Sequence, residues 1–541
     1  MGILSLVYFI VLIVMSIWTY VVCREWSDAS ETHKMIVGFL TLVMWLFFFW
    51  WLRPWFHGIV LPLFHIGLPL TLILIGLIGF AIFAGIKEQS VITVILVVLA
   101  VIFFIWPTCF SGPFFMKALY ENTEYKKTEG LPQIEKMRLL PLSVAKRYAD
   151  DSFQESREKL SNYTIVNKSG ELVWQAPRVP DGFFIYFSNK MGGVVEVSSE
   201  NSKKQIHKET FSMEISEGVA IEDNIRFYLY KRDYWIYIPD AIYYLNDVEK
   251  EQWVAVVPFI EYRFSFPVRY PAFGGVYLVY DDGTIVKLNP KDCDKSELLQ
   301  GNVFYPEWLH RKEVEAYAYH KGINNKLFQH EDQIEVADVL ESGNPQPYLL
   351  MSENGPTWFT AAEPYGKAFG ILKVFTRSAS KSKEPINILE YSEDSILTGP
   401  RRTVGYVRSS RNVTVPDWRS YATIETRPAP INNVLYWQLS IVPYSETGSG
   451  SEATVDKDKS FTGVYATVFI DSRTNEVFAF KDDENVIKFT EGKWDVRIKN
   501  DFDMLSSYIS KDITSDDVKS NPIEVIDRII QELIHLKQEL E

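Results

Sequence analysis

Cysteine is scarce in this chain of 541 residues, which contains only Cys23, Cys109 and Cys293. Two of the three lie at the ends of apolar stretches, so the rest of the chain cannot form a disulfide framework or a zinc site built from cysteines. A lack of disulfides favours a reducing compartment, but it is equally usual for extracytoplasmic bacterial proteins. The cysteine content therefore leaves the compartment open.

The common catalytic motifs are absent. There is no G-x-x-x-x-G-K-[ST] phosphate loop, no G-x-S-x-G nucleophile turn and no H-E-x-x-H metal helix. The chain has 8 histidines. Of these, His310, His320 and His330 recur at ten-residue steps; a metal site is one interpretation, and surface positions on a helix and its flanking loop are the preferred one. The sequence predicts a protein that is not an enzyme and has no cofactor or metal.

Charged residues are rare over the first 120 positions. Five of the 55 basic and four of the 69 acidic residues fall there, which leaves 50 basic and 65 acidic residues, a net charge of −15, for the remainder. An acidic surface argues against nucleic-acid binding. Long apolar runs separate the few charges, and a run of about 20 apolar residues is long enough to cross a bilayer as a helix.

These runs predict a transmembrane region over residues 1–119. Arg53-Pro54 ends the second run, because arginine prefers the headgroups and proline breaks a helix. Pro62 and Pro69 divide the stretch that follows it. Four spans fit best, although three or five remain open. The predicted spans are 3–22, 35–52, 69–86 and 91–106.

Arg53, His57 and His65 form a candidate polar site within this apolar region. An ionisable group inside a membrane is costly, and it commonly marks a proton relay or a ligand site. The alternative is that both histidines lie neutral and wetted at headgroup depth beside Arg53. That alternative is preferred here, because no acidic partner is near in sequence.

Beyond the apolar region the pattern changes to the period of two that indicates strands. A weak internal repeat appears, in which a strand with tryptophan and then proline is followed by a glycine that opens a valine-rich strand. Each copy predicts a small antiparallel meander that needs a helix or a second sheet to cover its apolar face. Chance similarity of aromatic strands is the alternative. The tryptophans of the four copies are Trp174, Trp253, Trp358 and Trp437.

The predicted organisation is a transmembrane region followed by tandem α+β units. A helical connector is expected over 120–161, and the C-terminus reads as an amphipathic helix, with Asn521 as cap and Pro522 at its first turn. The predicted units cover 162–300 (one or two units), 301–400 and 401–515, and the C-terminal helix covers 521–541.

The C-terminal helix carries apolar residues at alternating steps of three and four, which is the spacing of a short coiled-coil seam. It predicts self-association or partner docking. Packing on the helix's own domain is the alternative, because two heptads are short for an independent coiled coil. The seam consists of Ile526, Ile529, Leu533, Leu536 and Leu540.

Several motifs resemble a known family. The run from Met137 to Tyr148, the strand from Gly274 to Val279 and the Pro306–Leu309 segment are similar to an uncharacterised group of Gram-positive membrane proteins, some of them labelled as cell-shape related. Asp471–Val477 resembles the D-x-x-T-G-E-V ending of PepSY units, with Asn475 where glycine is usual. The resemblance implies membrane spans followed by PepSY-like units, and it provides no catalytic residues.

The sequence thus predicts a non-enzymatic, membrane-anchored scaffold or interaction protein of the cell envelope that forms oligomers. The alternatives are a PepSY-like regulator of a membrane or cell-wall hydrolase, and a transporter or channel subunit. The expected partners are the lipid bilayer, another copy of the chain and a protein still to be identified, with no nucleic acid. Basic residues after the last run favour a cytoplasmic C-terminal region, whereas the resemblance favours an extracytoplasmic one, which is preferred.

Overall fold

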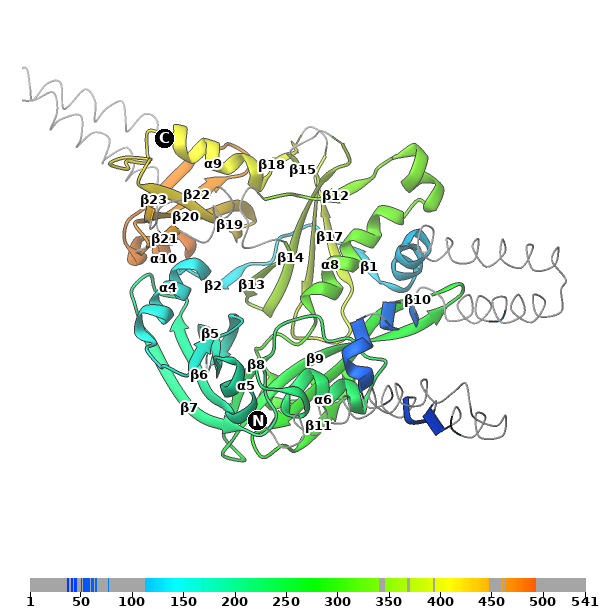
Figure 1. The fold of residues 1–541 in the computed structure, drawn as a ribbon. Helices are drawn as coiled ribbons and strands as arrows, with labels where there is room; N and C mark the ends of the chain where they lie inside the picture. Colours follow the sequence, from blue (N-terminus) through cyan, green and yellow to red (C-terminus); the bar gives the residue numbers. More distant parts are fainter. Residues whose placement is uncertain are drawn as a thin grey trace, which may run out of the picture.

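The computed structural model describes residues 112–492, apart from 169, 340–345, 367–369, 393–394, 447–458 and 462, together with scattered positions between 37 and 76, mainly within 52–65. Strands dominate this part of the chain (Figure 1). The predicted spans 3–22 and 91–106, nearly all of 69–86, and the C-terminal helix lie outside the described residues, as does about half of 35–52.

The described strands fall mainly into four successive units, each of which has one helix followed by a four-stranded antiparallel meander. Unit 1 contains α4 (Leu142–Ser152), β4 (Thr164–Lys168), β5 (Glu171–Pro180), β6 (Met191–Ser198) and β7 (Ile206–Met213). Unit 2 contains α6 (Ile225–Arg232), β8 (Tyr243–Asp247), β9 (Gln252–Ser265), β10 (Val268–Tyr280) and β11 (Ile285–Leu288). Unit 3 contains α8 (Glu307–Ala316), β13 (Tyr348–Ser352), β14 (Gly355–Pro364), β16 (Lys373–Ser378) and β17 (Ile386–Glu390). Unit 4 contains α9 (Pro400–Ser409), β19 (Tyr421–Ile431), β20 (Val434–Glu446), β22 (Ala466–Asp471) and β23 (Val477–Phe480).

Shorter elements join and extend these units. The helices are α5 (Phe183–Ser188), α7 (Pro290–Cys293) and α10 (Asp483–Thr490). The strands are β1 (Tyr125–Lys127), β2 (Ile134–Lys136), β3 (Glu158–Leu160), β12 (Ile334–Val336), β15 (Gly370–Ile371), β18 (Leu397–Thr398) and β21 (Lys459–Phe461). Through β1, β2 and β12, the sheet of unit 3 grows to seven strands.

Each helix begins where its local sequence permits. Proline precedes or opens α4, α8 and α9, at Pro141, Pro306 and Pro400, where its fixed φ fits and its missing N–H costs nothing. In unit 2 the side chain of Asn224 caps α6 by accepting from the backbone N–H groups of Arg226 and Phe227. The start of its helix already distinguishes unit 2 from the other three.

The predicted pairing of each tryptophan strand with the glycine-led strand after it is present in all four units, as β5–β6, β9–β10, β14–β16 and β20–β22. Glycine is required in the third strand of units 1 and 2 at equivalent places. Gly193 and Gly275 have φ of +127° and +124°, and a Cβ on either would fall about 2 Å from a carbonyl oxygen of the next strand.

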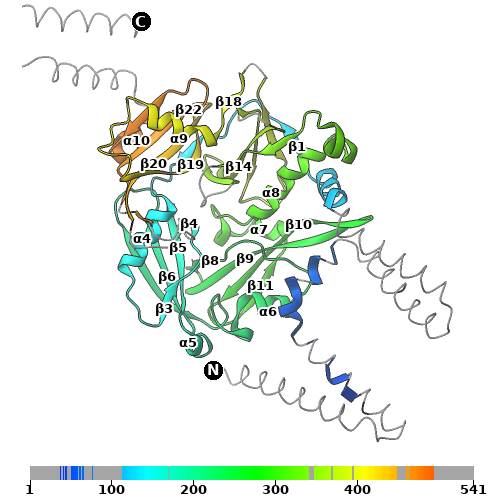
Figure 2. The same ribbon diagram turned by 45° about the horizontal axis from the view of Figure 1, so that its top comes forward.

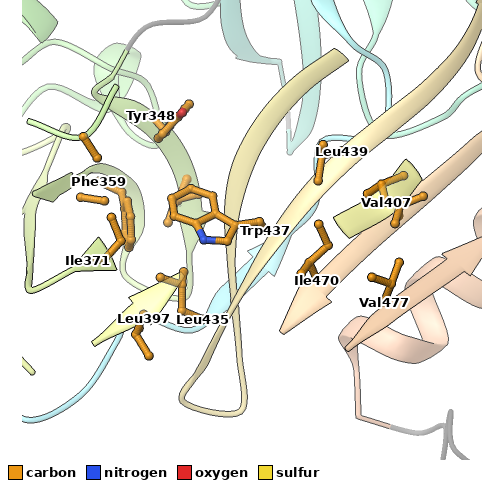
Figure 3. Close-up of a cluster of buried hydrophobic side chains, with 14 of the residues drawn as sticks. Tyr348, Phe359, Ile371, Leu397, Val407, Leu435, Trp437, Leu439, Ile470 and Val477 are labelled. Atoms are coloured by element: carbon orange, nitrogen blue, oxygen red, sulfur yellow. The ribbon is translucent and has the colours of Figure 1, made fainter. Parts of the chain in front are cut away.

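The four units close into a ring, because each helix lies between its own sheet and the sheet of the unit before it (Figures 1 and 2). Leu309 of α8 shares a buried cluster with unit 2, and Val407 of α9 shares one with unit 3. Val144 of α4 closes the ring, since it packs in one cluster with Val442 of unit 4. Figure 3 shows the junction of units 3 and 4, where Trp437 and Leu435 face Phe359 and Ile371.

The predicted fold class, a multi-span membrane anchor ahead of tandem PepSY-like units and a C-terminal amphipathic helix, is wrong. The structure is built chiefly from β-sheets, and none of the helices among its described residues is long and apolar enough to cross a membrane. The prediction rested on the length of apolar runs, and length does not say what covers a run. The predicted unit boundaries at 300, 400 and 515 stay predictions.

Candidate ligand-binding cleft

A cleft of about 850 Å³ opens where unit 1 meets unit 2. Its floor is one face of the unit 2 sheet, formed by Leu278 of β10 together with Val286 and Leu288 of β11. Leu278 pairs directly with Val286 across the two strands, which places both side chains on the same face. One wall is β4 of unit 1, and the other is the segment 295–302 that follows α7. Clefts of this size are typical of ligand sites.

The wall from unit 1 carries a charged cluster. The Lys168 ammonium lies 2.7 Å from Glu196 and 2.9 Å from Glu209. Desolvation by burial lowers the pKa of Lys168, but its hydrogen bonds to the two carboxylates outweigh that effect and raise the pKa overall. Glu196 is 2% exposed and also accepts a hydrogen bond from Gln175 Nε2. Lys168 is therefore a fixed cation at this wall, with 41% of its side chain exposed.

The opposite wall is fixed by two asparagines. Asn302 accepts a hydrogen bond from the backbone N–H of Asn167 and donates one to the backbone carbonyl of the same residue. Its side-chain amide thus imitates a strand partner for β4. Asn167 in turn donates to the carbonyl of Gly301. These bonds hold the 295–302 segment at a set distance from unit 1, and so they define the width of the cleft.

Unit 2 contributes aromatic and charged groups at the β8–β9 turn. Lys250 Nζ donates to the Tyr280 hydroxyl at 2.6 Å, and that hydroxyl donates to Asp247 at 3.3 Å. The Trp253 ring stacks on Phe211 of unit 1, with centroids 4.1 Å apart and the planes 8° from parallel. This half-buried tryptophan lines the cleft at the seam between the two units.

Trp253 occupies a shifted position in its strand. In units 1, 3 and 4 the tryptophan is the fourth residue of the strand, because β5, β14 and β20 begin at Glu171, Gly355 and Val434. In β9, which begins at Gln252, the tryptophan is the second residue and Ala255 is the fourth. A shift of two residues keeps the side chain on the same face but moves it toward the turn. The tryptophan of unit 2 therefore reaches the edge of the cleft.

The lining of the cleft contains both signs of charge above an apolar floor. Three lysines and four carboxylates contribute, so neither sign dominates. The charged residues are Lys168, Lys250, Lys295, Glu196, Asp247, Glu249 and Glu297. The arrangement suits a ligand that has an apolar side and carries charges of both signs.

The structure brings the candidate polar residues Arg53, His57 and His65 together against unit 2. Arg53 donates to the Lys231 carbonyl, His57 stacks on Tyr230 with centroids 3.7 Å apart, and His65 stacks on Tyr262. Burial lowers the pKa of His57, while burial and the nearby charges of Arg269 and His57 lower the pKa of His65 to about 3. Both imidazoles are therefore neutral at pH 7. A ligand or proton role for them stays a prediction.

The seam Ile526, Ile529, Leu533, Leu536 and Leu540 lies outside the described residues. His310 is buried beside the Thr360 hydroxyl, whereas His320 and His330 bond to a backbone carbonyl and to Gln333. Within the described residues no group of three His, Cys, Asp or Glu side chains is placed to hold a metal ion.

The predicted function, a membrane-anchored scaffold with a PepSY-like regulator or a transporter subunit as alternatives, is wrong. It depended on the anchor, and the described part of the chain provides a ring of sheets and no helix able to span a bilayer. The description of the protein as a membrane protein with PepSY-like units is wrong for the same reason.

The cleft could not be predicted from the sequence. Its charged residues are spread over three strands and two loops, so their spacing along the chain carries no pattern. One signal was present, because Trp253 directly follows the first residue of its strand while the other three tryptophans come later. Without the turn positions, that offset was not visible.

Comparisons with known proteins add little. No family model matches the chain, and no curated protein matches it. A solved structure of a "putative glycoside hydrolase" from Parabacteroides distasonis ATCC 8503 matches with 10% identity over 68% of this chain and 84% of that one, with a TM-score of 0.18. A likeness at this level carries no argument about fold or function.

Proposed function

We propose that this protein binds an extended peptide segment in the cleft between units 1 and 2, and that it does so without catalytic chemistry. One observation carries the proposal: the apolar floor formed by β10 and β11 ends at an edge strand and is rimmed by charges of both signs. An extended peptide with apolar residues at alternate positions presents the complementary surface.

The edge strand supplies backbone groups for such a ligand. Among the described strands, β11 pairs with β10 alone. An unpaired strand edge is a template for the addition of another strand. Val286 and Leu288 point into the cleft from this strand, and Val286 is 36% exposed. A strand added at β11 would place alternate side chains on the same face of the sheet, beside Val286 and Leu288, and so would extend the apolar floor.

The polar groups of the cleft support binding more than catalysis. The Lys168 ammonium is held between Glu196 and Glu209, and the Tyr280 hydroxyl lies between Lys250 and Asp247. These groups satisfy one another, whereas a nucleophile or general base needs an exposed lone pair aimed at the substrate. They can still pair with charges on a peptide at the rim.

The test uses a fluorescent heptapeptide in which valine alternates with glutamate and lysine, and a second peptide of the same composition with its valines consecutive. Fluorescence anisotropy on the full chain should give a Kd of about 10 μM for the alternating peptide and at least tenfold weaker binding for the other. Mass spectrometry after incubation should find both peptides intact.

The variant Val286→Lys places an ammonium group on the apolar floor and should weaken binding at least tenfold. Ile396→Lys is the matched control, because Ile396 is 40% exposed and lies outside the cleft. Equal affinity for both peptides, or equal losses in the two variants, would refute the proposal. Cleavage of the peptide would refute its non-catalytic part.

A further inference from the structure

Two arginines lie beside a small cavity at the meeting point of units 1, 3 and 4. The cavity has a volume of about 30 Å³. Leu172 of unit 1, Leu350 of unit 3 and Ile134 of β2 line it with apolar surface, and Lys136, Arg138 and Arg427 line it with charge. Lys136 is paired with Glu200, at 3.7 Å, which leaves the two arginines to be balanced. A volume of this size holds one water-sized particle. This cavity is separate from the cleft between units 1 and 2.

Arg427 is buried without a full set of partners. Its side chain is 4% exposed, and no hydrogen-bond acceptor among the described residues is within reach of Nε, Nη1 or Nη2. Buried guanidinium groups are normally paired and hydrogen-bonded, because burying an uncompensated charge is expensive. Three donor nitrogens beside a cavity therefore call for an acceptor inside it.

The only carboxylate that an ion pair places near either arginine, within the described part of the chain, is Glu425. Its Oε2 lies 3.8 Å from Arg427 Nη1 and 3.9 Å from Arg138 Nη2, which is too far for a hydrogen bond to either. Its Oε1 accepts from the backbone N–H of Leu142, at the start of α4. One carboxylate thus faces two guanidinium groups, and one positive charge remains uncompensated.

A β-bulge creates this arrangement. The register of β19 against β20 jumps between Ile424 and Arg427, and Glu425 has φ of +52°. A bulge re-aims the side chains on either side of it. Here it lets Glu425 reach α4 while Arg427 lies at the cavity. Burial, together with the charge of Arg138, lowers the pKa of Arg427 to about 9, so the side chain is still a cation at neutral pH.

We propose that this cavity binds one small monovalent anion of the chloride class, held by the guanidinium groups of Arg427 and Arg138. Guanidinium groups only donate, and an anion only accepts, so the two are complementary. A water molecule would need acceptors for its own hydrogens, and most of the cavity wall is apolar. A single negative charge would balance the single uncompensated positive one, whereas sulfate carries two negative charges and is larger.

The test measures thermal unfolding of the full chain in sodium chloride between 1 and 200 mM, with sodium gluconate holding the ionic strength constant. The Tm should rise with chloride by about 3 °C, because a ligand bound only by the folded state stabilises it. Bromide should act like chloride, and sulfate should act like gluconate. An anomalous bromide peak beside Arg427 in crystals would place the ion.

Three variants make the result specific. Arg427→Met removes the donors and should abolish the chloride response, whereas Arg411→Met, at an exposed arginine, should keep it. Glu425→Gln removes the competing negative charge and should lower the apparent Kd for chloride at least tenfold. A response of equal size in wild type and R427M, no response in wild type, or weaker chloride binding in E425Q would overturn the proposal.

Discussion

The second strand of every unit carries a tryptophan, but this tryptophan has a different role in unit 2 from its role in the other three units. Trp174, Trp358 and Trp437 are each no more than 6% exposed. Each donates its indole N–H to a backbone carbonyl at the start of the helix of its own unit. The acceptors are Leu140, Tyr305 and Thr398, which lie one or two positions before the proline that precedes or opens the helix. Trp253 is half-buried, and its indole makes no hydrogen bond within the described residues.

The difference shows how small a change converts a structural anchor into part of a binding surface. In three units a tryptophan ties the second strand to the start of the helix. In unit 2 the equivalent position holds Ala255, which is fully buried, and the helix starts at a capping asparagine and not at proline. The tryptophan, moved two residues along the strand, stacks on unit 1 and lines the cleft.

The largest expected effect is on an anchoring tryptophan. Trp437→Ala should lower the free energy of unfolding by about 4 kcal/mol, because it empties a fully buried site and leaves the Thr398 carbonyl without its donor. Guanidinium unfolding followed by fluorescence and circular dichroism measures it. A loss below about 1 kcal/mol would mean that the anchors of the ring lie elsewhere.

A buried carboxyl just before α6, at the start of unit 2, should make the stability of the protein depend on pH. Burial, opposed in part by Arg226, raises the pKa of Glu217 to about 7 from an ordinary value of 4.5. The folded state therefore keeps a proton that the unfolded state releases, and this stabilisation is complete below pH 4.5 and is lost as the pH rises to 7. The loss should be on the order of 3 kcal/mol.

Glu217→Gln, which imitates the protonated side chain, should flatten this part of the stability profile between pH 4.5 and 7. The exposed Glu484 provides the control variant, Glu484→Gln, which should leave the profile unchanged. If E217Q and wild type lose stability in parallel over this range, Glu217 does not hold its proton in the folded state.

A smaller effect is expected at Ala255. Ala255→Trp restores the tryptophan position of the other units, but the space around this residue is already filled by α6 and the neighbouring strand. Overpacking should lower the unfolding free energy by about 2 kcal/mol. Thermal melts of A255W and of the double variant with Trp253→Ala would show whether unit 2 can return to the common arrangement. An A255W protein as stable as wild type would contradict the assignment of Ala255 as the equivalent position.

Part of the fold followed from local signals. The tryptophan strand, the proline that follows the tryptophan and the glycine that opens the next strand predicted the meanders, because proline and glycine constrain the backbone wherever they occur. The closure of four units into a ring depends on which apolar faces pack against one another, and these contacts cannot be predicted from a single sequence. The membrane anchor was wrong because an apolar run says only that its residues avoid water.

Neither the cleft nor the cavity beside Arg427 could be predicted from the sequence, and the reasons differ. The cleft combines β4, the β8–β9 turn and the 295–302 segment, which pack together only after two units fold. Arg427 was hidden because a charged residue in a strand normally faces solvent, and only the bulge at Glu425 places it inside. Both sites arise between elements and not within one.

The most direct test of the central claim compares affinity and stability in one variant, Trp253→Ala. If the shifted tryptophan serves the cleft, the affinity for the alternating heptapeptide should fall about tenfold while the unfolding free energy changes by less than about 1 kcal/mol. If W253A instead destabilises the protein as much as W437A and leaves the peptide affinity unchanged, Trp253 is an anchor like the others and the cleft is not a binding site.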